Sequence, residues 1–267
     1  MGAILKYMEF RVLKDRIEKE IKNLEGIVGL SIKFINSSET IEINSQQQIW
    51  AASIIKLPIA CELFKQVEEG EFSLATRNKV DSENIVEGTG VIKLLDSDDK
   101  FTLLDLAKLM LAISDNSATN QIVDLIGREN VENYMYKLGL TKTTYRHKMM
   151  FKEGRGPNLT TAADILSLLE MLQNNKLAGS KQILDILKQQ QNRTGIPSHL
   201  PNNIQIAHKT GSLPEAMHDA GIVYSTNTFI FVFLSDQRKD KRLTNNVLSE
   251  CAKLCYEYSI ANTAAKE

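Results

Sequence analysis

A hydroxyl and an amine stand three residues apart in the stretch AASIIKLPIA, residues 51–60: Ser53 and Lys56. Side chains at this spacing share one face of a helix, so the pair could be a nucleophile and its base. The same pair is equally typical of a helix-capping serine followed by a solvated lysine. By itself S-x-x-K is therefore a weak signal.

Two further motifs help to decide whether Ser53 and Lys56 form a catalytic pair. Ser114-Asp115-Asn116 falls at the break between two predicted helices, where Ser114 or Asp115 could simply cap the second helix. Lys209-Thr210-Gly211 ends a predicted strand and could be a glycine turn. Each motif has an ordinary structural explanation, but all three in this order rarely occur together by chance.

S-x-x-K, S-D-N and K-T-G in this order resemble the signature of the penicillin-recognising serine hydrolases, the class A β-lactamases and penicillin-binding proteins. KLPIA (56–60), GTGVIKLL (88–95), TTAADI (160–165) and HDAGIVY (218–224) are also similar to class A β-lactamase segments, so the resemblance covers most of the chain. It implies that a β-lactam amide is opened through a Ser53 acyl-enzyme. The alternative is a D-alanyl-D-alanine peptidase or esterase, or a penicillin-binding sensor that keeps a stable acyl adduct.

The resemblance implies a catalytic role for three of these side chains. Ser53 is the expected nucleophile at a helix start, where Pro58 is tolerated because its missing N–H costs little in the first turn. Lys56 is the expected base, provided that burial and the nearby charge of Lys209 lower its pKa. The hydroxyl of Ser114 is expected to relay a proton to the leaving nitrogen.

The remaining motif residues are expected to bind substrate. Asn116 can donate to and accept from a side-chain amide, and Lys209 and Thr210 suit a carboxylate. Gly211 would let the strand lie close to the acyl group. The backbone N–H of Ser212, together with that of Ser53, is expected to form the oxyanion hole.

The chain departs from the family in two places. No E-x-x-L-N occurs in residues 143–164, TTYRHKMMFKEGRGPNLTTAAD, and Glu153 is the only carboxylate there before Asp164. Glu153 is a candidate for activating the deacylating water, although a solvated loop residue is the simpler explanation. Slow hydrolysis of the acyl-enzyme is the expected consequence. The family's arginine near the strand after K-T-G is also missing; His218 lies there instead, and Arg193 is another candidate partner for a carboxylate.

Composition and spacing argue against other functions. The net charge of -1 gives no electrostatic footprint for nucleic acid, and the four histidines form no cluster with metal-ligand spacing. His218 and Asp219 are adjacent on a predicted strand and point to opposite faces, so they do not form one catalytic relay. We therefore expect no cofactor and no metal, a small-molecule substrate (a β-lactam or a D-alanyl peptide) and a monomer.

The elements that must position these residues come from both ends of the chain. Periodicity predicts a helix over 10–24, strands over 27–35 and 40–44, an almost entirely helical stretch from 53 to 191, strands over 204–209, 220–225 and 228–234, and a last helix over 243–260. The fold class is α/β (α+β), an antiparallel sheet flanked by N- and C-terminal helices with an inserted all-helical lobe. The expected lobes are 1–52 with 197–267, and 53–196, with the active site in the cleft between them.

The first residues, MGAILKYMEF, do not form a convincing secretory leader, because charges interrupt the apolar run. We expect a cytoplasmic protein as the sequence is written, and an extracytoplasmic one if a leader has been removed. The longest apolar runs are far short of a membrane span. Cys61, Cys251 and Cys255 are odd in number and form no C-x-x-C, so core packing is their expected role.

Overall fold

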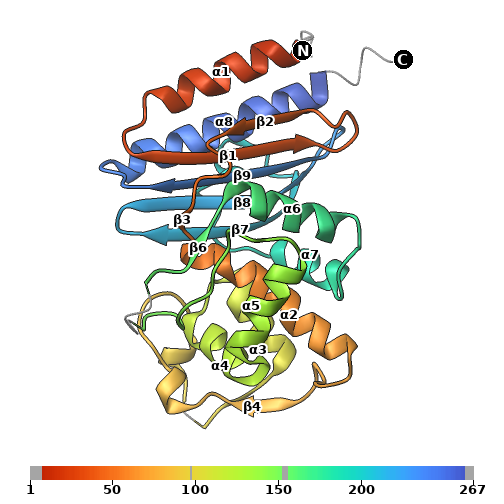
Figure 1. Ribbon diagram of the computed structural model, residues 1–267, viewed down its shortest axis with the longest axis vertical. Helices are drawn as coiled ribbons and strands as arrows, with labels where there is room; N and C mark the ends of the chain where they lie inside the picture. Colours follow the sequence, from red (N-terminus) through yellow and green to blue (C-terminus); the bar gives the residue numbers. More distant parts are fainter. Residues whose placement is uncertain (1–7, 97, 152–155, 262–267) are drawn as a thin grey trace.

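One antiparallel sheet of five strands divides the molecule into layers (Figure 1). The computed structural model describes residues 8–96, 98–151 and 156–261. The strand order is β2-β1-β9-β8-β7. The bounds are β1 (Ile27–Phe34), β2 (Thr40–Ile43), β7 (Gln205–Leu213), β8 (Ala216–Tyr224) and β9 (Phe229–Asp236). Strands from both ends of the chain thus share one sheet, which confirms the predicted fold class.

The two terminal helices, α1 (Phe10–Lys22) and α8 (Lys241–Ala261), lie side by side over one face of this sheet (Figure 1). Leu13, Ile17 and Ile21 recur every four residues in α1 and form its buried stripe. They join a hydrophobic core that contains the aromatic side chains of β9 and the inward face of α8. Complete burial of each such aliphatic side chain stabilises the fold by about 1.5–3 kcal/mol.

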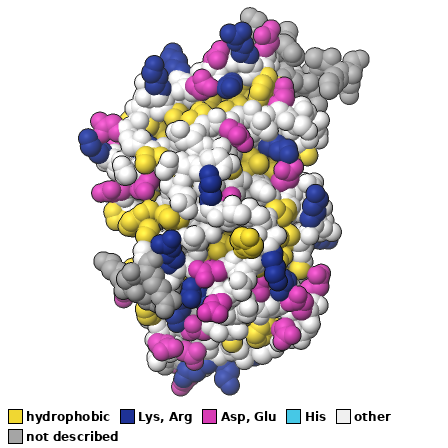
Figure 2. Space-filling model, viewed as in Figure 1, with side chains coloured by type: hydrophobic (Ala, Val, Ile, Leu, Met, Phe, Trp, Pro, Cys, Tyr) yellow, Lys and Arg dark blue, Asp and Glu magenta, His cyan; other side chains and the backbone are white. Residues whose placement is uncertain are grey.

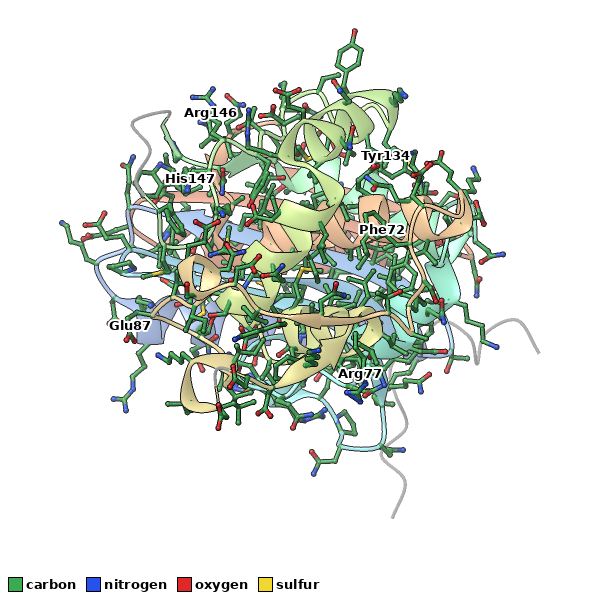
Figure 3. All side chains as sticks on the ribbon, turned by 90° about the horizontal axis from the view of Figure 1, so that it is seen from below. Phe72, Arg77, Glu87, Tyr134, Arg146 and His147 are labelled. Atoms are coloured by element: carbon green, nitrogen blue, oxygen red, sulfur yellow. The ribbon has the colours of Figure 1, made fainter. Side chains whose placement is uncertain are left out.

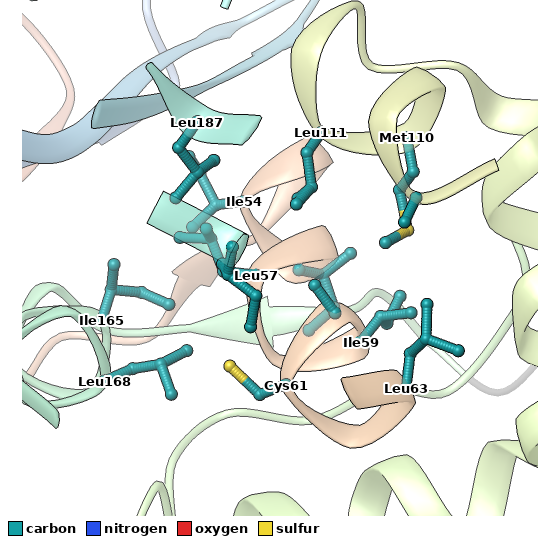
Figure 4. Packing of buried hydrophobic residues seen from close by; sticks show 14 of the residues in the cluster. Ile54, Leu57, Ile59, Cys61, Leu63, Met110, Leu111, Ile165, Leu168 and Leu187 are labelled. Atoms are coloured by element: carbon teal, nitrogen blue, oxygen red, sulfur yellow. The ribbon is translucent and has the colours of Figure 1, made fainter. Parts of the chain in front are cut away.

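The other face of the sheet carries the helical part of the chain (Figure 1). Its helices are α2 (Lys56–Glu68), α3 (Leu103–Ala112), α4 (Asn116–Ile126), α5 (Arg128–Lys137), α6 (Ala162–Gln173) and α7 (Ser180–Leu187). The central helix α2 is buried on nearly all sides, since ten of its thirteen residues are buried. Figure 4 shows Leu57 and Ile59 of α2 packed among side chains such as Met110 and Leu111. A helix that is surrounded in this way is a rigid platform for the residues at its start.

The structure differs from the sequence-based expectation in two details. Strands β7 and β8 run further than predicted, because the ladder continues through Gly211 opposite His218 to Leu213 opposite Ala216. Two short antiparallel pairs also occur: β3 (Ile49–Trp50) with β6 (Leu159–Thr160), and β4 (Arg77–Lys79) with β5 (Lys100–Thr102). Strands of two or three residues are too short to show the alternation from which a strand is predicted.

All three cysteines are free and buried in the core, as the sequence predicted. Among the described residues, no helix is long and apolar enough to cross a membrane. Basic and acidic side chains are interspersed on the face that Figure 2 shows, so the described part of that face has no patch of a single sign.

Candidate active site

Ser53 lies in a short 3-10 helix, η1 (Ala52–Ile55), which leads directly into α2. Lys56 is the first residue of α2 and Pro58 the third, so the proline stands in the first turn as expected. Ala52 has a positive φ of 44°, an unfavourable backbone conformation for a residue with a Cβ. This strained residue directly precedes the proposed nucleophile, where the chain enters η1.

The segment before Ser53 is anchored from two sides. The backbone oxygen of Trp50 accepts a hydrogen bond of 2.8 Å from Nε2 of His218 in β8. The backbone N–H of Ala51 donates to the backbone oxygen of Asn158 at 2.8 Å. The turn that carries Ser53 is therefore fixed to the sheet and to the loop before β6 at the same time.

Lys56 is completely buried, at 0% exposure, and its amine points at the S-D-N motif. Its Nζ donates to the backbone oxygen of Ser114 at 2.7 Å and to Oδ1 of Asn116 at 2.8 Å, and lies 3.1 Å from Oγ of Ser114. Burial, together with the charge of Lys209, lowers the pKa of Lys56 well below its usual value, and the carboxylate of Asp115 only partly opposes this. The expected cause and direction of the shift are thus both present.

Asp115 holds the S-D-N motif in place. Its Oδ1 accepts from the backbone N–H of Ala118 at 2.9 Å, which makes it the N-cap of α4, one of the two caps considered from the sequence. Its Oδ2 accepts from the backbone N–H groups of Val91 and Ile92 at 2.7 and 3.0 Å. Ser114, directly before it, has a positive φ of 60°. One buried carboxylate therefore joins α4 to the 88–92 loop and orients Ser114.

Sequence reasoning did not single out Thr89, whose hydroxyl donates to the backbone oxygen of Ser114 at 2.7 Å. The flanking glycines explain how it comes so close. A Cβ on Gly90 would lie 2.3 Å from the carboxylate of Asp115, and one on Gly88 would lie 2.6 Å from Nδ2 of Asn116. The signal that could have found Thr89 is the pair of glycines around it.

The K-T-G motif lies on β7, the edge strand of the sheet. Lys209 is fully buried, and desolvation lowers its pKa to about 7, with Asp219 opposing the shift. Its Nζ donates to the backbone oxygen of Thr210 at 2.8 Å. A Cβ on Gly211 would lie 2.9 Å from His218 and 3.3 Å from Cβ of Ala52, so only glycine lets β7 pack this closely against η1. Ser212, the next residue, is exposed.

The geometry of His218 does not support the predicted contact with a substrate carboxylate. Its Nε2–H donates to Trp50, and its Nδ1 accepts from the backbone N–H of Ser235 at 3.0 Å. Desolvation lowers the pKa of His218 to about 4, so the ring is neutral. With both nitrogens engaged and no charge, His218 is a structural support of the nucleophile's turn.

A second histidine forms a pair that the sequence did not reveal. Nδ1 of His208 lies 2.9 Å from a carboxylate oxygen of Asp219, and both side chains are buried. The other carboxylate oxygen accepts from the backbone N–H of Ile196 at 2.8 Å. His218 and Asp219 have different partners, in agreement with the argument that neighbours on a strand do not form one relay.

Two cavities meet at this site. One, of about 390 Å³, is lined by Ser114, Thr210 and Gly211, and the other, of about 610 Å³, is lined by Ser53 and Asn116; Thr89 and Ser212 line both. The larger cavity has an apolar wall: Trp50, Met149, Met150, Phe151 and Leu213. His147 and Gly88 also line the larger cavity. Figure 3 shows His147 on the same side of the molecule as Glu87, the residue before Gly88.

The expected deacylating residue, Glu153, lies outside the described residues. Asn158 of the same segment is buried; its side chain accepts from the backbone N–H of Arg146 at 2.7 Å and donates to the backbone oxygen of His147 at 3.0 Å, so it supports the loop. Among the described residues that line the two cavities there is no aspartate or glutamate.

The site has the features of the class of penicillin-recognising serine hydrolases. These are a serine at the start of a buried helix, a buried lysine, and a K-T-G edge strand that faces an S-D-N turn. The chain belongs to the β-lactamase enzyme family, whose model matches residues 12–259.

Curated relatives agree with this. The chain is 23% identical over 265 residues to β-lactamase VEB-1 of Pseudomonas aeruginosa, covering 91% of this chain and 89% of the relative. It is 22% identical over 277 residues to the extended-spectrum β-lactamase PER-1 of the same organism, covering 95% and 89%.

Solved structures show the same fold. A β-lactamase from Sphaerobacter thermophilus superposes with a TM-score of 0.88 at 24% identity, over 94% of this chain and 98% of that one. The structure of PBP-A superposes with a TM-score of 0.85 at 24% identity, over 99% and 100%.

Proposed function

We propose that this protein is a serine hydrolase that opens the cyclic amide of a β-lactam through an acyl-enzyme on Ser53. The observation that carries the proposal is the environment of Lys56: a buried amine with a lowered pKa, in contact with Ser114 and Asn116 and three residues from Ser53. A lysine that is neutral part of the time can accept a proton from a serine hydroxyl.

In the acylation step, Oγ of Ser53 attacks the lactam carbonyl carbon and its proton passes to Nζ of Lys56. The C–N bond of the ring then breaks. The proton reaches the leaving nitrogen through Oγ of Ser114, which lies 3.1 Å from Nζ of Lys56. The backbone N–H groups of Ser53 and Ser212 are the proposed donors to the oxyanion. All of these residues come from one chain, so the proposed chemistry needs no second copy.

The two cavities suggest which parts of the substrate lie where. The smaller one suits a carboxylate, because it is lined by Thr210, whose backbone oxygen accepts a hydrogen bond from Lys209. The larger one suits an apolar acyl side chain, because Trp50 and Met150 in its wall are 50% and 60% exposed. An aromatic penicillin side chain fits that wall better than a charged one.

A stable acyl adduct is the second candidate outcome. It is favoured by the lack of a carboxylate among the described wall residues, since a water molecule there has no strong general base. A D-alanyl-D-alanine peptidase or esterase, or a penicillin-binding sensor, would fit slow release of the acyl group. Glu153 remains the proposed alternative base, and Lys56 the other.

Intact-protein mass spectrometry after mixing with benzylpenicillin tests the proposal. We expect the protein mass to increase by one penicillin molecule, and the Ser53→Ala variant to stay unmodified. Neither adduct nor hydrolysed penicillin from the wild type would contradict it. A chromogenic cephalosporin and a D-Ala-D-Ala peptide, assayed side by side, distinguish the β-lactamase from the peptidase.

A further inference from the structure

The first residue of α8 places a cation against the wall of the smaller cavity. Nζ of Lys241 donates to Oγ of Ser212 at 2.8 Å and to the backbone oxygen of Leu213 at 2.8 Å. Ser212 lines both cavities. The ammonium of Lys241 is therefore one hydrogen bond away from the space that a substrate would occupy.

Two further residues on the same face of α8 as Lys241 contact the wall of this cavity. Nδ2 of Asn245 donates to the backbone oxygen of Thr194 at 2.7 Å, and Oγ of Ser249 donates to that of Gly195 at 2.9 Å. Thr194 and Gly195 line the smaller cavity. Residues four apart share one helix face, so this face of α8 supports the back of the cavity. Lys241 is the charged residue among Lys241, Asn245 and Ser249.

Three other basic side chains near the cavity are less suited than Lys241 to be the main partner of an anion at neutral pH. Lys56 directs its hydrogen bonds to Ser114 and Asn116. Lys209 donates to its neighbour's backbone oxygen, and its low pKa leaves it only partly charged at neutral pH. His218 is neutral with both nitrogens engaged.

Lys241 differs from Lys56 and Lys209 because it is half-buried, whereas those two lysines are completely buried. Within the described part of the chain it forms no ion pair with a carboxylate. An ammonium without a counter-ion among the described residues, beside a cavity whose described wall has no acidic residue, is an electrostatic site for an anion. A carboxylate would accept the hydrogen bond that Nζ of Lys241 donates to Ser212, because a charge-assisted hydrogen bond is stronger than one to a hydroxyl.

We propose that Lys241 binds the carboxylate of the β-lactam and so takes the role that the sequence suggested for His218. The inference rests on the proposed function, because it assigns a partner to a group of that substrate. It makes Lys241 a specificity-determining residue that favours substrates with an anion next to the scissile amide.

The test compares a penicillin with the methyl ester of the same penicillin. The second-order rate constant of acylation is measured for the wild type, Lys241→Met and Lys241→Arg. We expect Lys241→Met to lose about tenfold with the acid and less than twofold with the ester. Lys241→Arg should restore most of the rate with the acid. Lys239→Met is the matched control, since Lys239 is exposed and pairs with Glu25, and it should not differ from the wild type.

Three outcomes would overturn the inference. Equal losses with acid and ester would mean that Lys241 only positions Ser212. A loss specific to the acid in Arg193→Met, with none in Lys241→Met, would assign the carboxylate to Arg193. Failure of both compounds to acylate the wild type would contradict the proposed function itself. Thermal unfolding of each variant identifies any loss that is caused by misfolding.

Discussion

A carboxylate at position 149 should convert slow release of the acyl group into turnover. Met149 is 9% exposed and lines the cavity that contains Ser53. Its backbone is clamped by the side chain of Asn120, which accepts from its N–H at 2.8 Å and donates to its oxygen at 3.2 Å. Glutamate is similar in size to methionine, so Met149→Glu should place a carboxylate in the cavity wall without leaving a void.

The size of the effect follows from the burial of this position. A positioned general base contributes about 10²–10⁴-fold to the rate of proton transfer. The apolar wall would raise the pKa of the new carboxyl, so only part of it would be ionised at neutral pH. We therefore expect deacylation to accelerate by about 100-fold, near the lower limit of that range. The buried polar group should lower the free energy of unfolding by about 1–3 kcal/mol.

The assay is the decay of the penicillin adduct in intact-protein mass spectra after free penicillin is removed. Met149→Gln is the control, because it has the same shape and cannot act as a base. Equal decay rates of the two variants, with both folded, would refute the argument that a base is what the wall lacks. Rapid turnover by the wild type would point to a base outside the described wall, and Glu153→Gln would then be the first variant to test.

Three further predictions follow from the geometry of the site. The rate of acylation by an anionic penicillin should show a bell-shaped pH profile. The rate should fall at low pH because Lys56 becomes protonated, and it should fall above about pH 7 because Lys209 loses its charge. A rate that keeps rising to pH 9 would contradict this. Asp115→Ala should lower the free energy of unfolding in urea by about 3–5 kcal/mol, because three backbone N–H groups lose a charged acceptor, and Asp115→Asn should lose less. Gly211→Ala should slow acylation by about tenfold or more with little change in Tm, since its Cβ displaces β7 from η1; an unchanged rate would show that β7 tolerates the shift.

The sequence predicted the parts of the site that depend on local spacing. Ser53 and Lys56 are placed by the helix that follows them, and Asp115 caps α4 because its side chain reaches N–H groups three residues on. The five-stranded sheet and both terminal helices were also predictable, since their apolar residues recur with the period of each element.

The parts that were missed depend on contacts between distant segments. The pairing of His208 with Asp219 requires the register of β7 against β8, which no local pattern specifies. The position of Thr89 requires the 88–92 loop to lie on the S-D-N turn. The hydrogen bonds of His218 could not be predicted either, because its partners Trp50 and Ser235 come from two other strands.

The pairing of β1 with β9 has a consequence for when the protein becomes active. Ile27 lies opposite Asp236, so the sheet closes only after segments about 200 residues apart have met. Such pairings form late in folding because loop entropy must be lost first. The turn that carries Ser53 rests on Gly211 and His218, which belong to the late-arriving strands. A nascent chain that has emerged only as far as α7 therefore holds its nucleophile and its base but lacks the β-strand wall of the pocket. Competence for acylation should return in the slowest phase of refolding.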